Sequence, residues 1–223
     1  MADLGVGRGP GGPPSLVWLL LVAVLTIAPG FGDEAGKAFV QVTLERMDGT
    51  EWKAVDPRTI LEHKDKIRFR FSTSFPGYLY VFNRASDGST DKLYPNEETA
   101  NNNRVEPGQS YLLPSASGNY LIDGPPGYDI THWIVTPEPM AALPTTSQLP
   151  KSEIPSTLIP RCREGGLRPR GGCLDDRAGP QATRDSDLKP RNIRIDKGSA
   201  DARITAPTVK TGPIVYEFRV AHQ

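Results

Sequence analysis

Residues 66–96 decide the fold, and their sequence is KIRFRFSTSFPGYLYVFNRASDGSTDKLYPN. Within residues 67–71, large apolar side chains alternate with polar ones, which is the period of a strand with one buried face. Pro76-Gly77 then turns the chain into residues 78–82, where every side chain is apolar or aromatic. A strand of that composition has both faces covered. The sequence therefore predicts that these two segments form the central pair of strands of a β-sheet.

The end of the same stretch predicts a further hairpin. Asp87-Gly88 supplies the turn, because glycine tolerates the positive φ angles that tight hairpin turns require. Residues 92–94 form a short return strand, and Pro95-Asn96 ends it, since proline cannot donate a hydrogen bond to a sheet.

Alternating patterns elsewhere predict the other strands of an all-β fold. Val40, Val42 and Leu44 share one face of a strand at residues 39–46, and Asp48-Gly49 turns it into a second strand. The other strands are expected at residues 51–55, 111–113, 120–122, 128–136, 192–196, 202–205 and 214–220. We expect an antiparallel two-sheet sandwich whose last strand belongs to the same sheet system as the N-terminal hairpin.

Residues 138–190 differ in character from the rest of the chain. Prolines recur throughout, and each one removes a backbone donor and restricts the residue before it. No long helix or central strand fits such a segment. We therefore expect residues 37–223 to form a single β-sandwich domain that carries a long, irregular, Pro/Gly-rich insertion at residues 138–190.

Several motifs of the central stretch resemble those of a known family. They are GYLYVF at residues 77–82, DG at 87–88, LYPN at 93–96, VEPG at 105–108, GPPGYD at 124–129 and IVT at 134–136. This pattern resembles the signature of the bacterial DUF4384 family, a domain of unknown function. The resemblance covers residues 61–137 and implies a small β-rich domain, often attached to other bacterial domains such as kinases or peptidases. It implies no activity and no catalytic residues.

Residues 1–32 have the pattern of a signal peptide. The apolar run at residues 16–28, LVWLLLVAVLTIA, is shorter than the roughly 20 residues that a membrane-spanning helix needs. Small residues follow it, so we expect cleavage between Gly30 and Ala35. The alternative is an uncleaved anchor or a buried strand. The expected destination is the periplasm or the exterior, with no stable membrane span after cleavage.

The charge balance excludes some classes of partner. The chain has 26 basic and 26 acidic residues, so no global field favours nucleic acid or an anionic membrane. For an exported protein, the expected partners are an envelope protein or a glycan.

Cys162 and Cys173 are predicted to form a disulfide, because an exported protein meets an oxidising compartment. Their spacing does not match a redox C-x-x-C motif, and no nearby histidine would complete a zinc site. Free thiols are the alternative state.

Four arginines surround this predicted disulfide loop: Arg161 lies just outside it, and Arg163, Arg168 and Arg170 lie within it. They could form a surface that binds an anion or docks a partner. The interpretation we prefer is a solvated charged loop whose arginines pair with neighbouring aspartates, since such surface pairs contribute only about 0–1 kcal/mol each.

No motif predicts a metal, a cofactor or a catalytic group. Two sets of residues could be taken for calcium ligands: Asp175, Asp176, Asp185 and Asp187, and then Asn83, Asp87 and Asp91. Neither set has the spacing of a calcium-binding loop.

The three histidines, His63, His132 and His222, belong to no hydrolase or metalloprotease motif, although a triad could assemble in space. We expect His132 to be packed among aromatic side chains. Most of the aromatic residues between 78 and 133 are expected in the core, the alternative being a recognition surface for peptide or glycan.

These patterns together predict an exported, non-enzymatic β-sandwich module, without a cofactor, that binds or scaffolds an envelope component. The alternative is a hydrolase-type enzyme with its site on the insertion.

Overall fold

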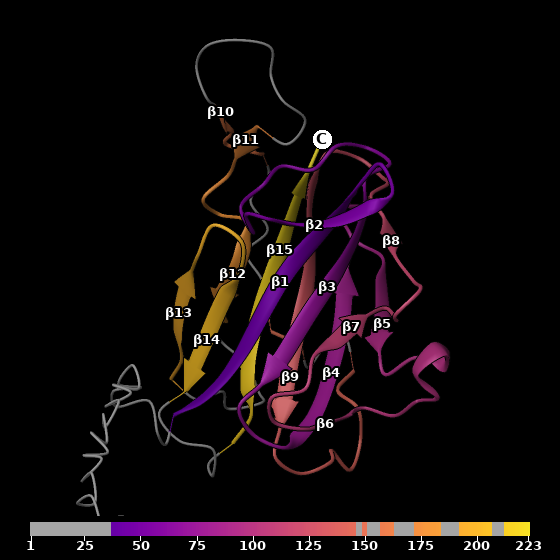
Figure 1. The fold of residues 1–223 in the computed structure, drawn as a ribbon, viewed down its shortest axis with the longest axis vertical. Coiled ribbons are helices and arrows are strands. Elements are labelled where there is room, and N and C mark those ends of the chain that lie inside the picture. The colour runs from indigo at the N-terminus through magenta and orange to yellow at the C-terminus, as the bar shows by residue number, and fades with distance from the viewer. Residues whose placement is uncertain (1–36, 146–148, 151–156, 163–171, 184–191, 207–211) are drawn as a thin grey trace, which may run out of the picture. The chain divides into compact units, whose positions relative to one another are not determined.

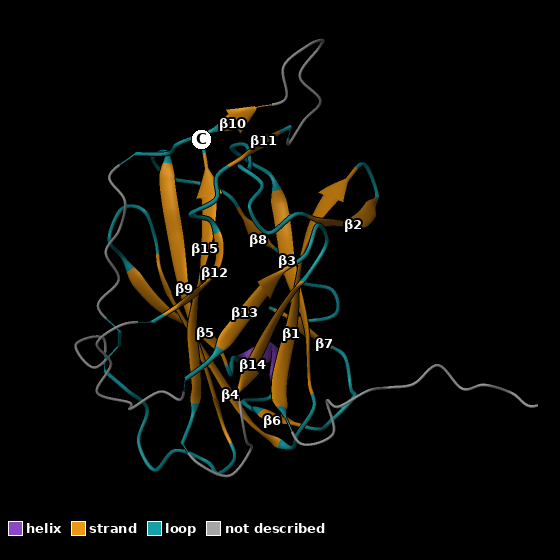
Figure 2. Cartoon of the chain, turned by 90° about the vertical axis from the view of Figure 1, so that its left-hand side faces the viewer, coloured by secondary structure: helices purple, strands orange, loops and turns teal. Residues whose placement is uncertain are grey.

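Two antiparallel β-sheets pack face to face in this protein, as Figures 1 and 2 show. The structure is a computed structural model and describes residues 37–145, 149–150, 157–162, 172–183, 192–206 and 212–223, all within the unit Ala35–Gln223. The predicted all-β sandwich is confirmed. The predicted signal peptide lies outside the described residues. No helix among the described residues is long and apolar enough to cross a membrane.

The sheet nearer the viewer in Figure 1 is called the front sheet here. Its strand order is β13 (Arg194–Lys197), β14 (Ala202–Ala206), β1 (Ala38–Asp48), β3 (Lys66–Thr73) and β7 (Tyr111–Leu113). In addition, β2 (Glu51–Val55) pairs with β1, and β8 (Tyr120–Leu121) pairs with β3. The hairpin predicted at residues 39–55 is therefore present.

The back sheet has the strand order β12 (Gly179–Ala182), β15 (Ile214–His222), β9 (Gly127–Thr136), β4 (Gly77–Arg84) and β5 (Thr90–Tyr94). One more strand, β6 (Arg104–Val105), pairs with β4. A separate two-stranded ribbon consists of β10 (Arg161–Cys162) and β11 (Cys173–Leu174). A 3₁₀ helix, Glu97–Thr99, follows β5 and is capped by the side chain of Asn96.

Trp133 lies at the centre of the core between the sheets. Its ring makes edge contacts with Phe69 and Phe71 at centroid distances of 5.5 and 5.6 Å and stacks on Tyr216 at 5.7 Å. The indole nitrogen donates to the hydroxyl of Thr131 at 2.9 Å, so its polar atom is satisfied. Each large side chain buried in this way contributes roughly 1.5–3 kcal/mol. The apolar side chains that alternate along β1 and β3 point into this core, as predicted from the sequence.

The prediction that residues 67–71 and 78–82 pair in one sheet is wrong. β3 pairs with β1, β7 and β8 of the front sheet, whereas β4 pairs with β9, β5 and β6 of the back sheet. A two-residue hairpin turn needs positive φ, and Gly77 does not have it. Instead, Phe75 inserts into the core with 2% of its surface exposed, and its carbonyl accepts a bond from the Thr73 hydroxyl at 2.7 Å. The connection therefore crosses between sheets.

The last strand, β15, lies in the back sheet between β12 and β9 rather than beside the N-terminal hairpin. It faces the front sheet across the core, where the rings of Phe218 and Phe69 are 5.1 Å apart. The expected association with the hairpin is thus a packing contact between sheets and not a hydrogen-bonded pairing.

Described residues of the insertion pack on the outer face of the back sheet. Two apolar clusters lie on this face; one contains Tyr80, Phe82, Ile134, Leu149 and Val215, and the other contains Ile60, Tyr128, Ile130, Ala178 and Ala221. Leu149 and Ala178 come from the insertion, so its chain supplies the cover that the apolar strand at residues 78–82 requires. The insertion contains no central strand among its described residues, as predicted, but Gly179–Ala182 adds a short strand to the edge of the back sheet. Pro180 is tolerated there because an edge strand has one unpaired side.

We predict that Gly77→Ala destabilises the fold. A Cβ at Gly77 would lie 2.5 Å from the carbonyl oxygen of Thr136, so β4 and β9 would have to move apart. Overpacking of this kind costs about 1–3 kcal/mol of unfolding free energy, measurable by urea denaturation. Gly127→Ala on β9 is the matched control, because the nearest atom would be 3.4 Å from its Cβ. Equal stability of the two variants would contradict the crossing geometry.

Candidate functional site

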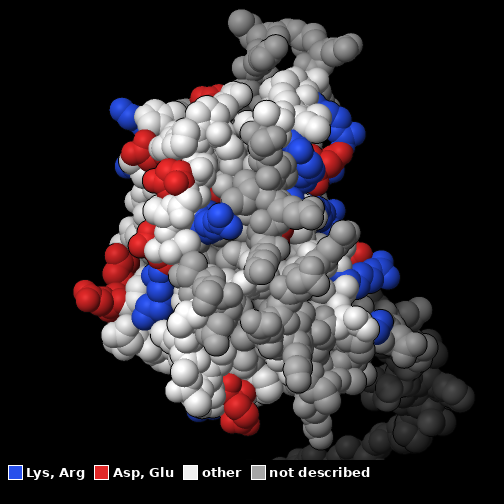
Figure 3. Space-filling model, turned by 180° about the vertical axis from the view of Figure 1, so that it is seen from behind, with Lys and Arg blue, Asp and Glu red and all other residues white. Residues whose placement is uncertain are grey.

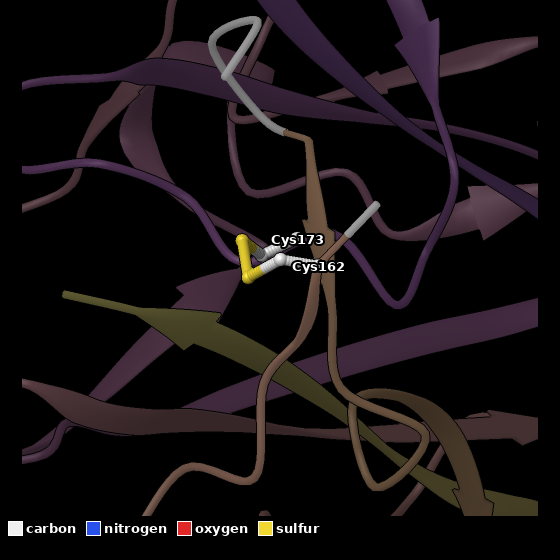
Figure 4. Close-up of a disulfide and its surroundings, with 2 residues drawn as sticks. All are labelled: Cys162 and Cys173. Atoms are coloured by element: carbon white, nitrogen blue, oxygen red, sulfur yellow. A yellow bond between two sulfur atoms is a disulfide. The ribbon is translucent and has the colours of Figure 1, made fainter. Parts of the chain in front are cut away.

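The predicted disulfide between Cys162 and Cys173 is present in the structure (Figure 4). The two cysteines lie directly opposite each other on β10 and β11. Arg161, the only residue of the predicted arginine surface among those described, forms an ion pair with Asp176. This pairing matches the charged-loop interpretation at that position. Arg163, Arg168 and Arg170 lie outside the described residues.

Asp175 is a structural anchor for the insertion. Its side chain is buried and accepts hydrogen bonds from the Tyr128 hydroxyl at 2.5 Å, the Ile159 amide at 2.7 Å and the Arg177 amide at 2.9 Å. Burial raises the pKa of Asp175, but these hydrogen bonds outweigh burial and hold the pKa below its usual value. The Asp175 carboxylate therefore attaches the insertion to β9 through these hydrogen bonds.

Neither predicted set of calcium ligands forms a metal site in the described part of the chain, where no three His, Cys, Asp or Glu residues converge. Asp87 accepts the Ser89 amide at 2.8 Å, as turn chemistry requires. Asp185 and Asp187 lie outside the described residues.

The three histidines lie in three different settings. His63 is exposed, with its Nδ1 3.6 Å from Asp123. The Nε2 of His222 is buried 3.4 Å from Asp129, whereas His132 lies on the outer face of β9. Ser86 also meets Asp129, but through its backbone amide at 2.8 Å and not through its hydroxyl. Among the described residues, no Ser, Thr or Cys side chain is hydrogen-bonded to a histidine.

A hollow of about 140 Å³ lies between the sheets. We call it the inter-sheet hollow, and its lining residues are Ile67, Phe69, Asn83, Leu93, Tyr120, Leu121, Ile122, Asp129, Thr131 and Val220. It lies on the side of the sandwich where β8 and β5 are short. On the opposite side, Lys197 of β13 donates to the carbonyl of Ala178 at 2.9 Å and ties the two sheets together. The hollow therefore exists because the two sheets are held together on the side of β13 but are less completely covered on the side of β8 and β5.

Polar groups line one side of the inter-sheet hollow. Asn83 and Thr131 are paired neighbours on β4 and β9 and face inward, as does Asp129. The Thr131 hydroxyl is occupied, since it accepts from Trp133 and donates to the Phe218 carbonyl at 3.2 Å.

The side chain of Asn83 also lines the hollow, and the buried hydroxyl of Tyr120 has no hydrogen-bond partner among the described residues. Burial, with a smaller contribution from Glu98, raises the pKa of Tyr120 well above its usual value, so the hydroxyl keeps its proton. The hollow thus offers a carboxylate and an amide opposite an apolar wall. It suits a small group that has an apolar body and hydrogen-bond donors.

Sequence reasoning missed this hollow. Its polar members lie on three separate strands, and Asn83 and Asp129 resemble ordinary strand-end residues in the sequence. One signal in the sequence could have indicated it. By strand alternation, Asp129 lies on the same face of β9 as Trp133, where an apolar residue is expected.

We predict that His132 makes stability depend on pH. Burial, together with the nearby charge of Arg84, lowers the pKa of His132 to about 4 from an ordinary value of 6.5. As the pH falls below 6.5, the unfolded chain gains a proton that the folded protein does not accept until about pH 4. Stability therefore decreases over this window by up to about 3 kcal/mol.

Denaturant titrations between pH 7 and 5 measure this loss. Over that range the carboxylates with lowered pKa values stay ionised. The change in unfolding free energy therefore comes from the protonation of histidine. His132→Gln should flatten the profile, and the exposed-site control His63→Gln should not. An unchanged profile in His132→Gln would refute the assignment.

Comparisons with known proteins gave one finding. The searches of curated proteins and of solved structures found no match to this chain. The family model described as "Domain of unknown function (DUF4384)" matches residues 61–139, about a third of the sequence. This segment contains every lining residue of the inter-sheet hollow except Val220. Residues 61–139 of this chain therefore match the DUF4384 family model, as the sequence motifs predicted.

Proposed function

We propose that this chain is an exported, non-enzymatic β-sandwich module that binds an envelope component in the inter-sheet hollow. The observation that carries the proposal is the hollow, in which the polar residues Asn83 and Asp129 lie opposite an apolar wall. Buried polar atoms in proteins are nearly always hydrogen-bonded. Tyr120, which lines the hollow, has one such unsatisfied atom, so polar pairing at the wall of the hollow is incomplete.

The size of the hollow restricts what enters it. A cavity of roughly 150 Å³ holds a molecule the size of benzene, and this hollow measures about 140 Å³. It therefore takes one side chain and not a drug-sized ligand, whose pockets begin near 300 Å³. Leu121 lines the hollow and is 51% exposed, so a partner that inserts a side chain would also cover it. We infer that the partner is an envelope protein that inserts a donor-bearing side chain beside Asp129.

Two observations support export. The apolar run at residues 16–28 has the length of a signal-peptide core. The disulfide between Cys162 and Cys173 is a bond that persists in oxidising compartments. The periplasm and the exterior both meet this condition.

No observation in the described residues favours the hydrolase alternative. A hydrolase site on the insertion would need a base and a nucleophile there, but Asp175 is committed to structural hydrogen bonds. Burial lowers the pKa of His132 to about 4, which makes this histidine a weak base at neutral pH.

Leu121→Arg tests the proposal. The long cationic side chain would occupy the mouth of the hollow beside Asp129 and exclude a partner. We expect capture from an envelope extract of the source organism to fall at least tenfold relative to the wild-type protein, which corresponds to about 1.4 kcal/mol. Quantitative mass spectrometry of the captured proteins measures this.

Ile159→Arg is the matched control, because it adds the same charge at a residue that is 60% exposed and does not line the hollow. Capture should survive in this variant. Equal recovery by the wild-type protein and Leu121→Arg, or no specific recovery by the wild-type protein, would defeat the proposal. Protease treatment of the extract distinguishes a protein partner from a glycan. If captured material survives the protease, the partner that binds in the hollow is a glycan.

A further inference from the structure

A second hollow lies on the outer face of the back sheet, on the other side of β4 from the core. We call it the outer hollow; it measures about 310 Å³, and its described lining residues are Arg84, Gly88, Thr90, His132, Leu149 and Pro150. Arg84 ends β4 and pairs directly with Thr90, which begins β5. Leu149 and Pro150 come from the insertion. The outer hollow therefore lies between the β4–β5 hairpin and the chain that covers the sheet.

Figure 3 shows this side of the molecule from behind, with described charged residues mainly along its two sides. Within the sheet, His132 pairs with Phe82, two residues before Arg84 on the same strand. His132 and Arg84 are thus diagonal neighbours on one face, within reach of a common ligand.

His132 has an unsatisfied polar atom. The residue is 2% exposed, and its Nδ1 is buried without a hydrogen-bond partner. Such groups are rare in native proteins because each one loses its hydration without replacement. His132 also lines the outer hollow, so an incompletely paired imidazole lies at the wall of that hollow.

Arg84 makes no ion pair or hydrogen bond with any described residue. Other arginines around the back sheet are paired, as Arg58 is with Asp56, Arg177 with Asp175 and Arg219 with Glu217. The guanidinium group of Arg84 therefore has its planar set of donors available. That geometry matches an oxyanion, which can accept two parallel hydrogen bonds from it.

We propose that the outer hollow binds an oxyanion, with Arg84 as its main ligand, the Thr90 hydroxyl as a further donor and the His132 side chain at its wall. The ligand class is a small molecule with a carboxylate, sulfate or phosphate group.

An adjoining hollow of about 380 Å³ shares Thr90 and Leu149 and adds Lys92 and Asp91. It provides space for the body of such a molecule. Across the two hollows the described charged side chains are Arg84, Lys92 and Asp91, a balance of +1 with His132 neutral. This site is separate from the inter-sheet hollow, so it goes beyond the proposed function and does not depend on it.

Titration of the full mature chain with sodium sulfate tests the proposal, with sodium chloride at matched ionic strength as the reference. We expect saturable NMR shifts of the His132 imidazole and the Thr90 amide with sulfate and none with chloride. Parallel titrations with inorganic phosphate and acetate identify the preferred group. Arg84→Gln should weaken sulfate binding at least tenfold, since it removes the charge and the paired donors.

Arg104→Gln is the matched control, because Arg104 lies on β6 of the same sheet, is exposed and pairs with Glu106 at 2.8 Å. Its sulfate affinity should equal that of the wild-type protein. Thr90→Val removes only a hydroxyl from an exposed position, and should weaken binding severalfold even if Arg84→Gln fails to fold. The proposal is overturned if no tested anion shifts His132 saturably, or if Arg84→Gln or Thr90→Val binds sulfate as the wild-type protein does. Equal weakening in Arg104→Gln would also overturn it, because the effect would then be general charge screening.

Discussion

The need to cover both faces of the back sheet constrains the rest of this structure. Its central strands, β4, β9 and β15, carry large apolar side chains on both faces. The inner face packs on the front sheet around Trp133. The outer face would expose side chains such as Tyr80 and Ile134, each worth roughly 1.5–3 kcal/mol when buried, if nothing lay over it. The insertion supplies that cover and is held in place by Asp175 and the strand β12.

This constraint also explains where polar groups gather. On the inner face, β9 and β4 continue past the main core and bring Asp129 and Asn83 between the sheets, where short edge strands leave the inter-sheet hollow. On the outer face, the insertion chain at Leu149 and Pro150 lies against the β4–β5 hairpin and encloses Arg84 with His132. Two hollows of different chemistry therefore lie on opposite faces of the same hairpin, one with a carboxylate and one with a guanidinium group.

Much of the fold could be predicted from the sequence, because alternation depends only on which side chains are buried. Val40, Val42 and Leu44 face inward as predicted, and the apolar strand at residues 78–82 is covered on both faces. Alternation does not identify the partner of a strand, so the crossing at Phe75 was predicted as a turn within one sheet. Neither hollow could be predicted, since each is formed by side chains from several elements whose meeting depends on tertiary register. The pairing of the two cysteines was predicted from the expectation of an oxidising compartment, and the structure contains it.

Hydroxyl-radical footprinting with mass spectrometry measures this coverage most directly, because labelling rates report side-chain exposure to solvent. If the insertion covers the back sheet, Tyr80, Tyr128 and Ile134 will be protected to the same degree as the core residue Trp133, and Leu121 will be labelled rapidly. Labelling of those three residues at a rate near that of Leu121 would contradict the account, because the outer face of the back sheet would then be open to water.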